Sequence, residues 1–412
     1  MDVAVMGFGT VGTGVVELLE KNHKNIVEKS GAESIELKYI LDIRDFPDSP
    51  YADKLIKDFN IILNDENVKI VVETMGGLKP AFDFVAACLK AGKSVVTSNK
   101  ELVAVKGYEL MQLACENNAS FLFEASVGGG IPIIRPLGNC LAANEIEDIA
   151  GILNGTTNFI LDKMIKESVS FESALKTAQE LGYAEKDPAA DVEGLDACRK
   201  ICILAALGFG HHVYPESVSA EGITDITLKD VEYAASIDGV IKLIARAKRL
   251  ENGRIAAYVS PSVVKNSMPL SKVDGVFNAI CVKGNAVGET MFYGRGAGKL
   301  PTASAVVADV IDCARHIDSK KLMHWQSSED SYVEDMAQLP VSMLIRGSCE
   351  DEAAVRQSIR ELFGDVCFAQ PSSAEKGSVA FVTPTLIQSR LDEDLASIAG
   401  FKIESRIRVL EF

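Results

Sequence analysis

The first fourteen residues constrain the fold of this chain more than any other stretch. Residues 2–6 form an apolar run, the turn GFGTVG occupies residues 7–12, and the next apolar residues recur at helical spacing. In a strand–turn–helix unit of this kind, Gly7 permits the sharp turn, Gly9 permits close approach of a pyrophosphate, and Gly12 permits the helix to pack on the strand. N–H groups and the helix dipole then hold the phosphates. We therefore expect a dinucleotide-binding domain, with a purely structural glycine turn as the alternative.

A second strand is expected over residues 35–41, and it ends at two opposite charges, Asp42 and Arg44. In a dinucleotide-binding fold, a carboxylate at this point accepts hydrogen bonds from the adenosine ribose and suits NAD, whereas a nearby arginine accommodates the extra phosphate of NADP. Because both are present, the sequence leaves the choice between NAD and NADP open. A pair of solvated loop charges is an equally weighted alternative.

Two further strands, over residues 70–74 and 94–97, place polar residues at their carboxyl ends, where ligands bind in open α/β sheets. Thr74 closes the first of these strands, and Ser98 and Lys100 follow the second. We expect Thr74 and Lys100 near the nicotinamide and the substrate, although a lysine at a strand end could simply be solvated. Helices are predicted over residues 80–91 and 107–117, and a strand over residues 120–124.

Three consecutive glycines, residues 128–130, follow Glu124 closely in the sequence. Backbone carbonyls exposed by such a run, together with Glu124, could hold a hard cation. A hinge between domains explains the same glycines equally well. Spacing alone leaves both interpretations open.

Residues 131–320 contain no second glycine turn of the first kind, and their connections look antiparallel. This pattern is typical of an α+β domain, which we expect to bind the substrate. Helices are predicted over residues 133–142, 157–167, 171–181, 194–209 and 228–236, and strands over residues 146–153, 238–247, 255–263, 275–283 and 286–293.

The most polar stretch of this part of the chain runs from Gly182 to Lys200 and enters an apolar helix. Asp196 and Lys200 are four residues apart, so they share one helix face. A surface ion pair is the usual meaning of such a spacing. Because apolar residues follow Lys200, we expect its base to be partly buried, and a partly buried lysine loses its charge readily and can transfer a proton.

Glycines at positions 294, 296 and 298 precede a helix of small residues, predicted over residues 302–315. We expect this helix to return to the first domain, with a plain hinge as the alternative. A polar, acidic stretch over residues 319–338 is expected as a linker. The remaining elements follow the β-α-β-β-α-β order of a ferredoxin-like module, with strands over residues 340–347, 365–369, 378–383 and 402–410 and helices over residues 351–363 and 385–398.

The composition of the chain limits which kinds of partner and which cellular compartment we expect. The chain has 412 residues and a net charge of −16, which argues against nucleic acid or an anionic membrane as its partner. None of its nine cysteines forms a CxxC pair, and we interpret Cys198 and Cys202 as core thiols rather than metal ligands. The sequence shows neither a leader peptide nor an apolar run long enough for a bilayer, so a cytoplasmic location is expected.

Five sequence blocks, taken in order, resemble the homoserine dehydrogenase family: GFGTVGTG, SNKEL, EASVGGGIPI, GYAEKDPAADVEGLDACRK and GRGAGKLPTASAVVAD. The resemblance covers residues 1–320 and implies an enzyme of threonine and methionine biosynthesis. Such an enzyme interconverts L-homoserine and L-aspartate 4-semialdehyde with NAD or NADP. The expected α/β architecture has a Rossmann-type NAD(P)-binding domain over residues 1–130 with a return helix over residues 301–318. An α+β substrate and dimerisation domain over residues 131–320 and a ferredoxin-like domain over residues 335–412 complete it.

The matching blocks also imply roles for individual residues. By the resemblance, Lys200 gives and takes the proton at the substrate oxygen, Lys100 reaches toward the reacting carbon, and Asp196 positions the substrate. Glu185 would bind the substrate ammonium, and Glu124 with the backbone carbonyls of Val127, Gly129 and Ile131 resembles the family's sodium site. The cofactor would lie against Gly7, Gly9, Thr10, Val11, Gly12, Thr74, Ser98, Lys100, Gly296 and Gly298, and the remaining substrate contacts would be Gly155, Thr156, Tyr183 and Asp191.

The C-terminal module resembles an ACT domain, which senses amino acids. In that family a small, glycine-containing loop between the first strand and helix usually holds the effector. Here the corresponding stretch, residues 347–352, has no Pro-Gly turn and carries three acids. Because those acids would repel an effector carboxylate, we expect dimerisation or a weakened effector site rather than strong threonine feedback, in a homodimer or homotetramer. The alternatives are an oxidoreductase for another small amino or hydroxy acid, and a non-catalytic sensor of nucleotides and amino acids.

Overall fold

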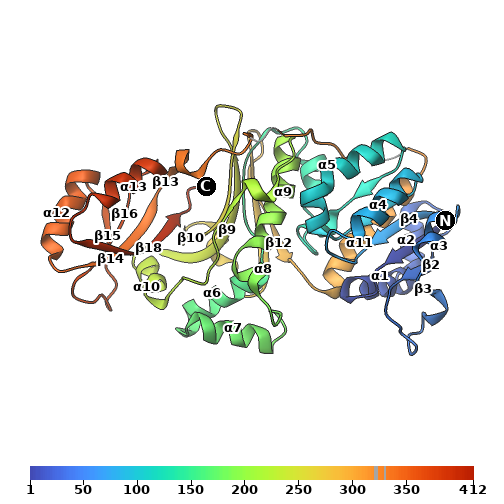
Figure 1. Cartoon of the computed structure of the whole chain (residues 1–412), viewed down its shortest axis with the longest axis horizontal. Helices are drawn as coiled ribbons and strands as arrows, with labels where there is room; N and C mark the ends of the chain where they lie inside the picture. Colours follow the sequence, from blue (N-terminus) through green and yellow to red (C-terminus); the bar gives the residue numbers. More distant parts are fainter. Residues whose placement is uncertain (320–322, 329–330) are drawn as a thin grey trace. The chain divides into compact units, whose positions relative to one another are not determined.

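The structure is a computed structural model that describes residues 1–319, 323–328 and 331–412 (Figure 1). It divides into two compact units, and each is described by itself. The first unit comprises Met1–Glu145, Cys202–Pro215 and Phe292–Glu329. The second unit comprises Ile146–Ile201, Glu216–Met291 and Asp330–Phe412.

A six-stranded parallel sheet forms the centre of the first unit, in the order β3-β2-β1-β4-β5-β6. This is the strand order of doubly wound dinucleotide-binding domains, and its switch point lies between β1 and β4. The expected α/β fold with an N-terminal parallel sheet is therefore confirmed. The strands are β1 (Asp2–Met6), β2 (Glu36–Leu41), β3 (Leu55–Ile56), β4 (Val68–Glu73), β5 (Ser94–Thr97) and β6 (Phe121–Leu122).

Helices cover this sheet because its strands are apolar on both faces. Val3 and Val5 of β1 share one buried cluster with residues of three helices, α1 (Thr10–Lys21), α2 (His23–Ser30) and α11 (Lys299–Arg315). Gly14 of α1 allows α11 to approach closely, since a Cβ atom there would lie 2.8 Å from the carbonyl oxygen of Lys299. The remaining helices are α3 (Phe59–Asn64), α4 (Ala81–Lys90) and α5 (Lys100–Glu116).

Three elements of the first unit differ from their predicted bounds. Helix α5 begins at Lys100 rather than at residue 107, because the Asn99 side chain caps it by accepting a hydrogen bond from the Leu102 N–H. The strand predicted over residues 120–124 is only β6, which a 3-10 turn over Glu124–Ser126 follows. The helix predicted over residues 133–142 contains a π-helical segment, Pro136–Cys140.

The predicted linker over residues 319–338 includes a residue of the core. Trp325 is buried, and its indole N–H donates to Nδ1 of His212 at 3.0 Å. Its ring also lies edge-on to the Phe123 ring, with the two ring centroids 5.7 Å apart. The polar composition around a single tryptophan hid this anchor. Residues 320–322 and 329–330 of the predicted linker lie outside the described residues.

The second unit is built on a mixed sheet in the order β12-β11-β7-β9-β10-β18-β14-β16-β15, with β8 beside β10. Its longest pairing is the antiparallel hairpin of β9 and β10, from Ile255↔Arg249 to Lys265↔Gly239. The core strands are β7 (Ile146–Ile152), β8 (Ser219–Ala220), β9 (Gly239–Arg249), β10 (Ile255–Lys265), β11 (Phe277–Gly284) and β12 (Gly288–Arg295), of which only the first half of β12 belongs to this unit. The helices are α6 (Gly155–Glu167), α7 (Phe171–Glu180), α8 (Ala189–Val192), α9 (Leu195–Phe209), whose first half belongs to this unit, and α10 (Leu228–Ser236).

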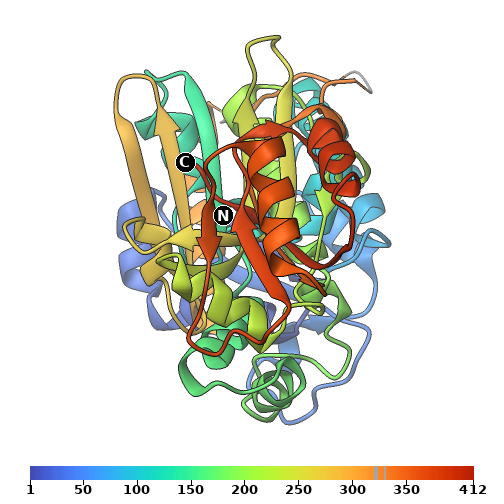
Figure 2. The same ribbon diagram turned by 90° about the vertical axis from the view of Figure 1, so that its left-hand side faces the viewer.

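The C-terminal part of this unit has the predicted β-α-β-β-α-β order. Its elements are β14 (Met343–Cys349), α12 (Glu352–Phe363), β15 (Cys367–Ala369), β16 (Ser378–Val382), α13 (Gln388–Ala396) and β18 (Phe401–Val409), with short β13 (Pro340–Val341) and β17 (Leu386–Ile387) paired beside them. Both helices contribute to one apolar cluster with β14 and β16, and Figure 2 shows them side by side over the strands. We call residues 340–410 the C-terminal module.

The C-terminal module joins the rest of the second unit through its last strand. Strand β18 pairs in parallel with β10 at two positions, Ser262↔Arg408 and Val263↔Val409. A buried ion pair between Arg346 Nε and Asp230 Oδ1, at 3.0 Å, ties β14 to α10. The sheet is therefore continuous from the core strands into the module.

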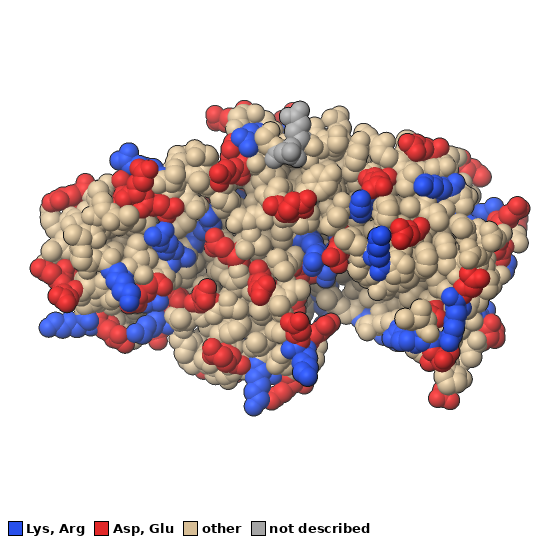
Figure 3. Space-filling model, viewed as in Figure 1, with Lys and Arg blue, Asp and Glu red and all other residues tan. Residues whose placement is uncertain are grey.

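Surface and composition features agree with a globular chain. On the face shown in Figure 3, acidic and basic side chains are interspersed rather than gathered by sign. No helix in the described part of the chain is both long and apolar enough to cross a bilayer. The nine cysteines are free thiols, and Cys198 and Cys202 are buried, as expected for core residues.

Candidate functional site

The glycine turn of the first unit is closed by contacts that a side chain would disrupt. A Cβ atom on Gly12 would lie 1.9 Å from the carbonyl oxygen of Gly7, and Gly7 itself has a φ of 98°. Gly9 differs, because a Cβ atom there would meet only the Arg44 guanidinium, at 4.0 Å. Gly9 is the N-cap of α1, and Thr10 and Val11 form its first turn. Gly7 and Gly12 therefore shape the turn, and Gly9 leaves open space at the positive end of α1.

Thr74 holds this turn to the end of β4. Its hydroxyl donates to the carbonyl oxygen of Gly7 at 2.9 Å, and its side-chain oxygen would lie 2.9 Å from a Cβ atom on Gly12. Thr74 also lines a cavity of about 420 Å³ with Gly7, Gly9, Asp42 and Arg44. The sequence placed Thr74 beside the nicotinamide, and the structure gives it a role in fixing the glycine turn.

Asp42 and Arg44 form an ion pair at the rim of the same cavity. The Asp42 carboxylate is buried and accepts from the Phe8 N–H at 2.7 Å and from Arg44 NH2 and Nε at 2.8 and 3.0 Å. The Arg44 guanidinium, which is partly exposed, lowers the pKa of Asp42 to about 2. The alternative of two solvated loop charges is therefore wrong for Asp42. Its oxygens are engaged within the protein, whereas Arg44 borders the cavity with Lys57 and Lys79.

The carboxyl ends of β4 and β5 are linked by a glutamate that the sequence analysis did not single out. Glu73 is fully buried, accepts from the Thr97 hydroxyl at 2.5 Å and from the Met75 N–H at 2.7 Å, and burial raises its pKa. A carboxylate within an otherwise apolar strand was the available signal. Ser98 and Lys100, both half-buried, follow directly, and Lys100 is the first residue of α5. The predicted polar residues thus lie at the edge of the sheet where ligands bind.

The Glu124 carboxylate is engaged by donors rather than turned toward backbone carbonyls. It accepts from the backbone N–H groups of residues 133–135, at 2.7 to 2.9 Å, and from Arg135 Nε at 3.1 Å. Asp309 lies behind it, where burial raises the pKa of that carboxyl to about 7. Among the residues that the structure describes, no group of three or more His, Cys, Asp or Glu side chains is placed to hold a metal ion.

The triple glycine after Glu124 packs against the segment that leads into α11. A Cβ atom on Gly129 would lie 2.3 Å from the carbonyl oxygen of Gly296, and the Gly130 N–H donates to the carbonyl of Arg295 at 3.0 Å. Gly298, with a φ of 124°, is the N-cap of α11. The glycines at both ends of this contact therefore allow two backbones to meet, a packing requirement that neither the hinge nor the cation interpretation included.

In the second unit, Lys200 and Asp196 are buried and paired. The Lys200 ammonium lies 2.7 Å from Asp196 Oδ2 and donates to the carbonyl oxygen of Leu153 at 2.8 Å. The expectation that the Lys200 base is buried is therefore confirmed, and the alternative of a surface ion pair is wrong. Leu153 follows β7, so the pair lies where that strand passes into α6.

Asn154 joins this pair to a second acid, and the sequence analysis did not single it out. Its amide nitrogen donates to Asp196 Oδ2 at 2.9 Å and to Asp191 Oδ1 at 2.7 Å, while its oxygen caps α6 by accepting from the Thr157 N–H. An asparagine directly before a helical pattern was the available signal. We call Asn154, Asp191, Asp196 and Lys200 the acid–lysine cluster.

Three other predicted substrate residues lie at the same end of α6. The Thr156 hydroxyl donates to the carbonyl of Tyr183 at 2.7 Å, and the Tyr183 ring packs edge-on against Phe159. Gly155 has no room for a side chain, because a Cβ atom would lie 2.7 Å from the carbonyl of Val276. Glu185 is exposed, and its side chain makes no hydrogen bond or ion pair within the described residues. The structure thus brings Thr156 and Tyr183 together and leaves Glu185 outside the cluster's hydrogen bonds.

Comparison with known proteins places this geometry in a family. A profile described as "Homoserine dehydrogenase, NAD binding domain" matches residues 7–124, and one described as "Homoserine dehydrogenase" matches residues 132–311. The homoserine dehydrogenase of Bacillus subtilis is 43% identical over 313 residues, which span 75% of this chain and 72% of that relative. The homoserine dehydrogenase of Pseudomonas aeruginosa is 35% identical and covers 99% of this chain and 98% of its own length.

Solved structures of homoserine dehydrogenases are also similar to this chain. The crystal structure of a homoserine dehydrogenase from Thiobacillus denitrificans superposes with a TM-score of 0.89 at 34% identity, over 100% of this chain and 98% of that one. A hyperthermophilic archaeal homoserine dehydrogenase in complex with NADPH superposes with a TM-score of 0.65 at 29% identity, over 78% of this chain and 99% of that one.

Proposed function

This chain belongs to the homoserine dehydrogenase family of NAD(P)-dependent oxidoreductases, and we propose from its geometry which residues carry the reaction. The single observation that supports these roles is the buried contact of 2.7 Å between Lys200 and Asp196 on α9, beside the start of α6. In the oxidation of L-homoserine to L-aspartate 4-semialdehyde, the alcohol loses a proton from oxygen and a hydride from carbon. The nicotinamide cofactor supplies the hydride chemistry when it is bound.

Lys200 is proposed to take the hydroxyl proton during oxidation and to return it during reduction. A lysine held in a buried site can change its charge state, and proton transfer by a positioned side chain accelerates a reaction about 10²- to 10⁴-fold. Asp196 holds the Lys200 ammonium and is proposed to position the substrate. Asp191, Thr156 and Tyr183 are proposed to contact the substrate. Lys100 would supply a second positive charge near the reacting carbon.

The matching test replaces the proton carrier by an unbranched side chain of similar shape that cannot be protonated. Lys200→Met should lower kcat for L-homoserine by about 10³-fold while NADPH still binds, because the glycine turn belongs to the other unit. The control is Lys283→Met, which removes an exposed lysine paired with Glu147 and should keep the normal rate. If Lys200→Met kept a rate near that of the unaltered enzyme, the proton role would be wrong. In the unaltered enzyme, preference for another amino or hydroxy acid would favour the alternative oxidoreductase, and no turnover at all would favour the non-catalytic sensor.

The first unit is proposed to hold the cofactor at the glycine turn. Open space at Gly9 and the free end of α1 fit a pyrophosphate, and the cavity of about 420 Å³ continues past Arg44. Arg44 and Lys57 at its rim suit the extra phosphate of NADP, whereas Asp42 is occupied by its own partners. We therefore propose that this enzyme prefers NADP. Gly7, Thr10, Val11, Gly12, Thr74, Ser98, Lys100 and Gly296 complete the proposed contacts.

Sodium is not assigned a step in this proposal. The Glu124 carboxylate does not fit as a ligand, because its four hydrogen bonds come from N–H donors that a cation would displace. A sodium ion at this turn would depend on main-chain carbonyls, those of Val127, Gly129 and Ile131.

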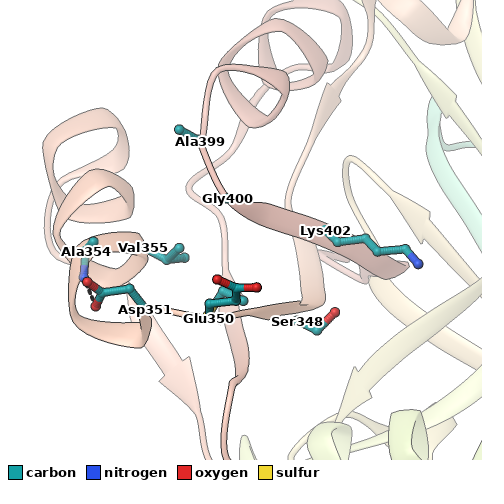
Figure 4. Close-up of a pocket in the computed structure, with 9 residues that line it drawn as sticks. Ser348, Glu350, Asp351, Ala354, Val355, Ala399, Gly400 and Lys402 are labelled. Carbon is teal, nitrogen blue, oxygen red and sulfur yellow. Dashed lines mark hydrogen bonds between the residues drawn. The ribbon is translucent and has the colours of Figure 1, made fainter.

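The C-terminal module is proposed to be ACT-like, with a weakened effector site or a role in dimerisation. A cavity of about 600 Å³ lies at its β14–α12 loop (Figure 4). Asp351 caps α12 by accepting from the Ala354 N–H, and Glu352 accepts from the Gly377 N–H, so two of the three acids are engaged. Figure 4 shows Glu350 between α12 and Lys402. L-threonine should inhibit weakly or not at all, and light scattering would report a homodimer or homotetramer.

A further inference from the structure

Asn154 is buried at the point where β7 passes into α6, and every polar atom of its side chain has a partner. The amide oxygen accepts from the Thr157 N–H at 2.9 Å, and the amide nitrogen donates to two carboxylates, at 2.7 and 2.9 Å. The orientation of the amide follows from these partners, because the flipped amide would place its oxygen against both carboxylates. One side chain therefore caps a helix and bridges two acids.

The bridge connects all the segments that form the acid–lysine cluster. Asp191 lies on α8, and Asp196 and Lys200 lie on α9. Asn154 Nδ2 and Lys200 Nζ donate to the same oxygen, Asp196 Oδ2, at 2.9 and 2.7 Å. Lys200 also donates to the carbonyl oxygen of Leu153, the residue before Asn154. A shift of Asn154 would therefore displace two oxygens that accept from the lysine amine.

The Asn154 bridge also affects the charged state of the two carboxylates that it joins, those of Asp191 and Asp196. The carboxylates of Asp196, which is buried, and Asp191, which is half-buried, lie on either side of the neutral Asn154 amide, and the amide donates to both of these like charges. A hydrogen bond to a carboxylate is stronger than one between neutral groups. Asn154 is thus suited to hold Asp191 and Asp196 together in their charged forms.

We propose that Asn154 is a positioning residue of the dehydrogenase reaction, which orients Asp196 and the Lys200 amine through its bridge to Asp191. This inference rests on the proposed role of Lys200. It assigns a function to the amide N–H groups that is separate from the capping of α6 by the amide oxygen. Substitutions can divide the two functions.

The test compares Asn154→Ser with Asn154→Asp, because serine and aspartate are both good helix N-caps and both lack the amide donors. With purified full-length enzyme, L-homoserine and NADP+, Asn154→Ser should lower kcat about tenfold or more, since small displacements of catalytic groups are costly. The KM for NADP+ and the melting temperature should stay close to those of the unaltered enzyme. The serine variant therefore separates positioning from folding.

Asn154→Asp adds a third carboxylate next to Lys200 and favours its ammonium form. Oxidation of L-homoserine requires the amine to accept a proton, so the pH–rate profile of this variant should move to higher pH. A residue that only capped α6 would leave the profile in place. Ser170→Ala, which removes the cap of α7, is the matched control for loss of a cap and should keep the normal kcat and profile.

Two outcomes would overturn the inference. The first is a normal kcat for Asn154→Ser, and the second is a loss of rate in both variants with an unmoved pH profile, which would indicate a structural role only. Failure of the proposed function is distinguishable, because it would appear as a normal rate for Lys200→Met. A slow Lys200→Met with a normal Asn154→Ser would reject the positioning role alone.

Discussion

The glycine turn of the first unit and the acid–lysine cluster of the second unit are built from different materials. The turn is made of main chain: Gly7 and Gly12 approach other backbone atoms so closely that a Cβ atom has no room. The cluster is made of buried side chains, whose positions depend on hydrogen bonds to one another. A main-chain site fails when an atom is added, whereas a side-chain site fails when a functional group is exchanged at constant shape.

The largest effect is expected from an isosteric change in the cluster. Asp196→Asn removes the charge that holds Lys200 but keeps the volume of the side chain, and it should lower kcat for L-homoserine by about 10²- to 10³-fold. Steady-state kinetics with NADP+ would measure it. Glu167→Gln, which removes an exposed ion pair with Lys163 on α6, is the control. A kcat of Asp196→Asn within a few-fold of the control would show that shape alone matters in the cluster.

The next effect is expected from a single methyl group in the turn. Gly12→Ala places a Cβ atom 1.9 Å from the carbonyl oxygen of Gly7, so it should weaken NADPH binding about 100-fold and lower the melting temperature by several degrees. Gly9→Ala meets only the Arg44 guanidinium and should weaken NADPH binding with an unchanged melting temperature. Fluorescence titration and thermal unfolding separate the two. Equal melting temperatures would contradict the distinction between shaping the turn and contacting the phosphate.

The third prediction concerns Asp309, a buried acid outside both sites, whose titration should make the stability of the fold depend on pH. Burial raises the pKa of Asp309 to about 7, above its ordinary value of about 4 in an unfolded chain. Its protonated form therefore stabilises the folded state, and this contribution is fully present below about pH 4 and is lost as the pH rises through about 7. In the unaltered protein, the free energy of unfolding should fall by on the order of 4 kcal/mol across that window, because each pKa unit corresponds to about 1.4 kcal/mol. Asp309→Asn should abolish this pH dependence. Denaturant titrations at several pH values would measure it, and an unchanged slope would contradict the assignment.

The smallest effect is expected at the rim of the cofactor cavity. Arg44→Ala should weaken NADP+ binding about tenfold more than NAD+ binding, because an exposed guanidinium interacts with a phosphate that NAD lacks. The dissociation constants of both cofactors would be compared in the variant and the unaltered enzyme. Equal weakening would remove Arg44 from the phosphate site and leave it only the role of partner to Asp42.

The same division explains what could be predicted from the sequence. The alternating pattern of apolar strands and helices and the spacing of Gly7, Gly9 and Gly12 predicted the parallel sheet and its cofactor turn, since both are encoded locally. The spacing of Asp196 and Lys200 indicated a shared helix face, and the apolar residues after Lys200 predicted a partly buried base, but only the structure shows that Asp196 is buried with it. The roles of Asn154 and Glu73 were not predicted, because their hydrogen-bond partners lie in other segments. The periodicity of a single strand or helix does not indicate such contacts.

Where the structure differs from the sequence predictions, the cause is a specific side-chain contact that the sequence pattern does not encode. Trp325 belongs to a polar stretch whose composition predicts a linker, yet it is buried against Phe123 and His212. Helix α5 starts earlier than its apolar pattern because the Asn99 cap, and not hydrophobic spacing, sets its first residue. The Glu124 carboxylate was expected as a cation ligand, but it accepts hydrogen bonds from three backbone N–H groups.

The pairing between β10 and β18 has a consequence for the independence of the C-terminal module. Only two ladder positions and the hydrogen bond from the Leu410 N–H to the carbonyl of Val263 connect the strands, whereas β14 and β18 are paired along most of their length. The strand pairing itself is therefore short, and the buried ion pair between Arg346 and Asp230 is a separate link between the module and α10. The edge of β10 that an open seam would uncover is too brief to invite aggregation. Changes within the C-terminal module, or its loss, could therefore occur during evolution without altering the register of the core strands of the second unit.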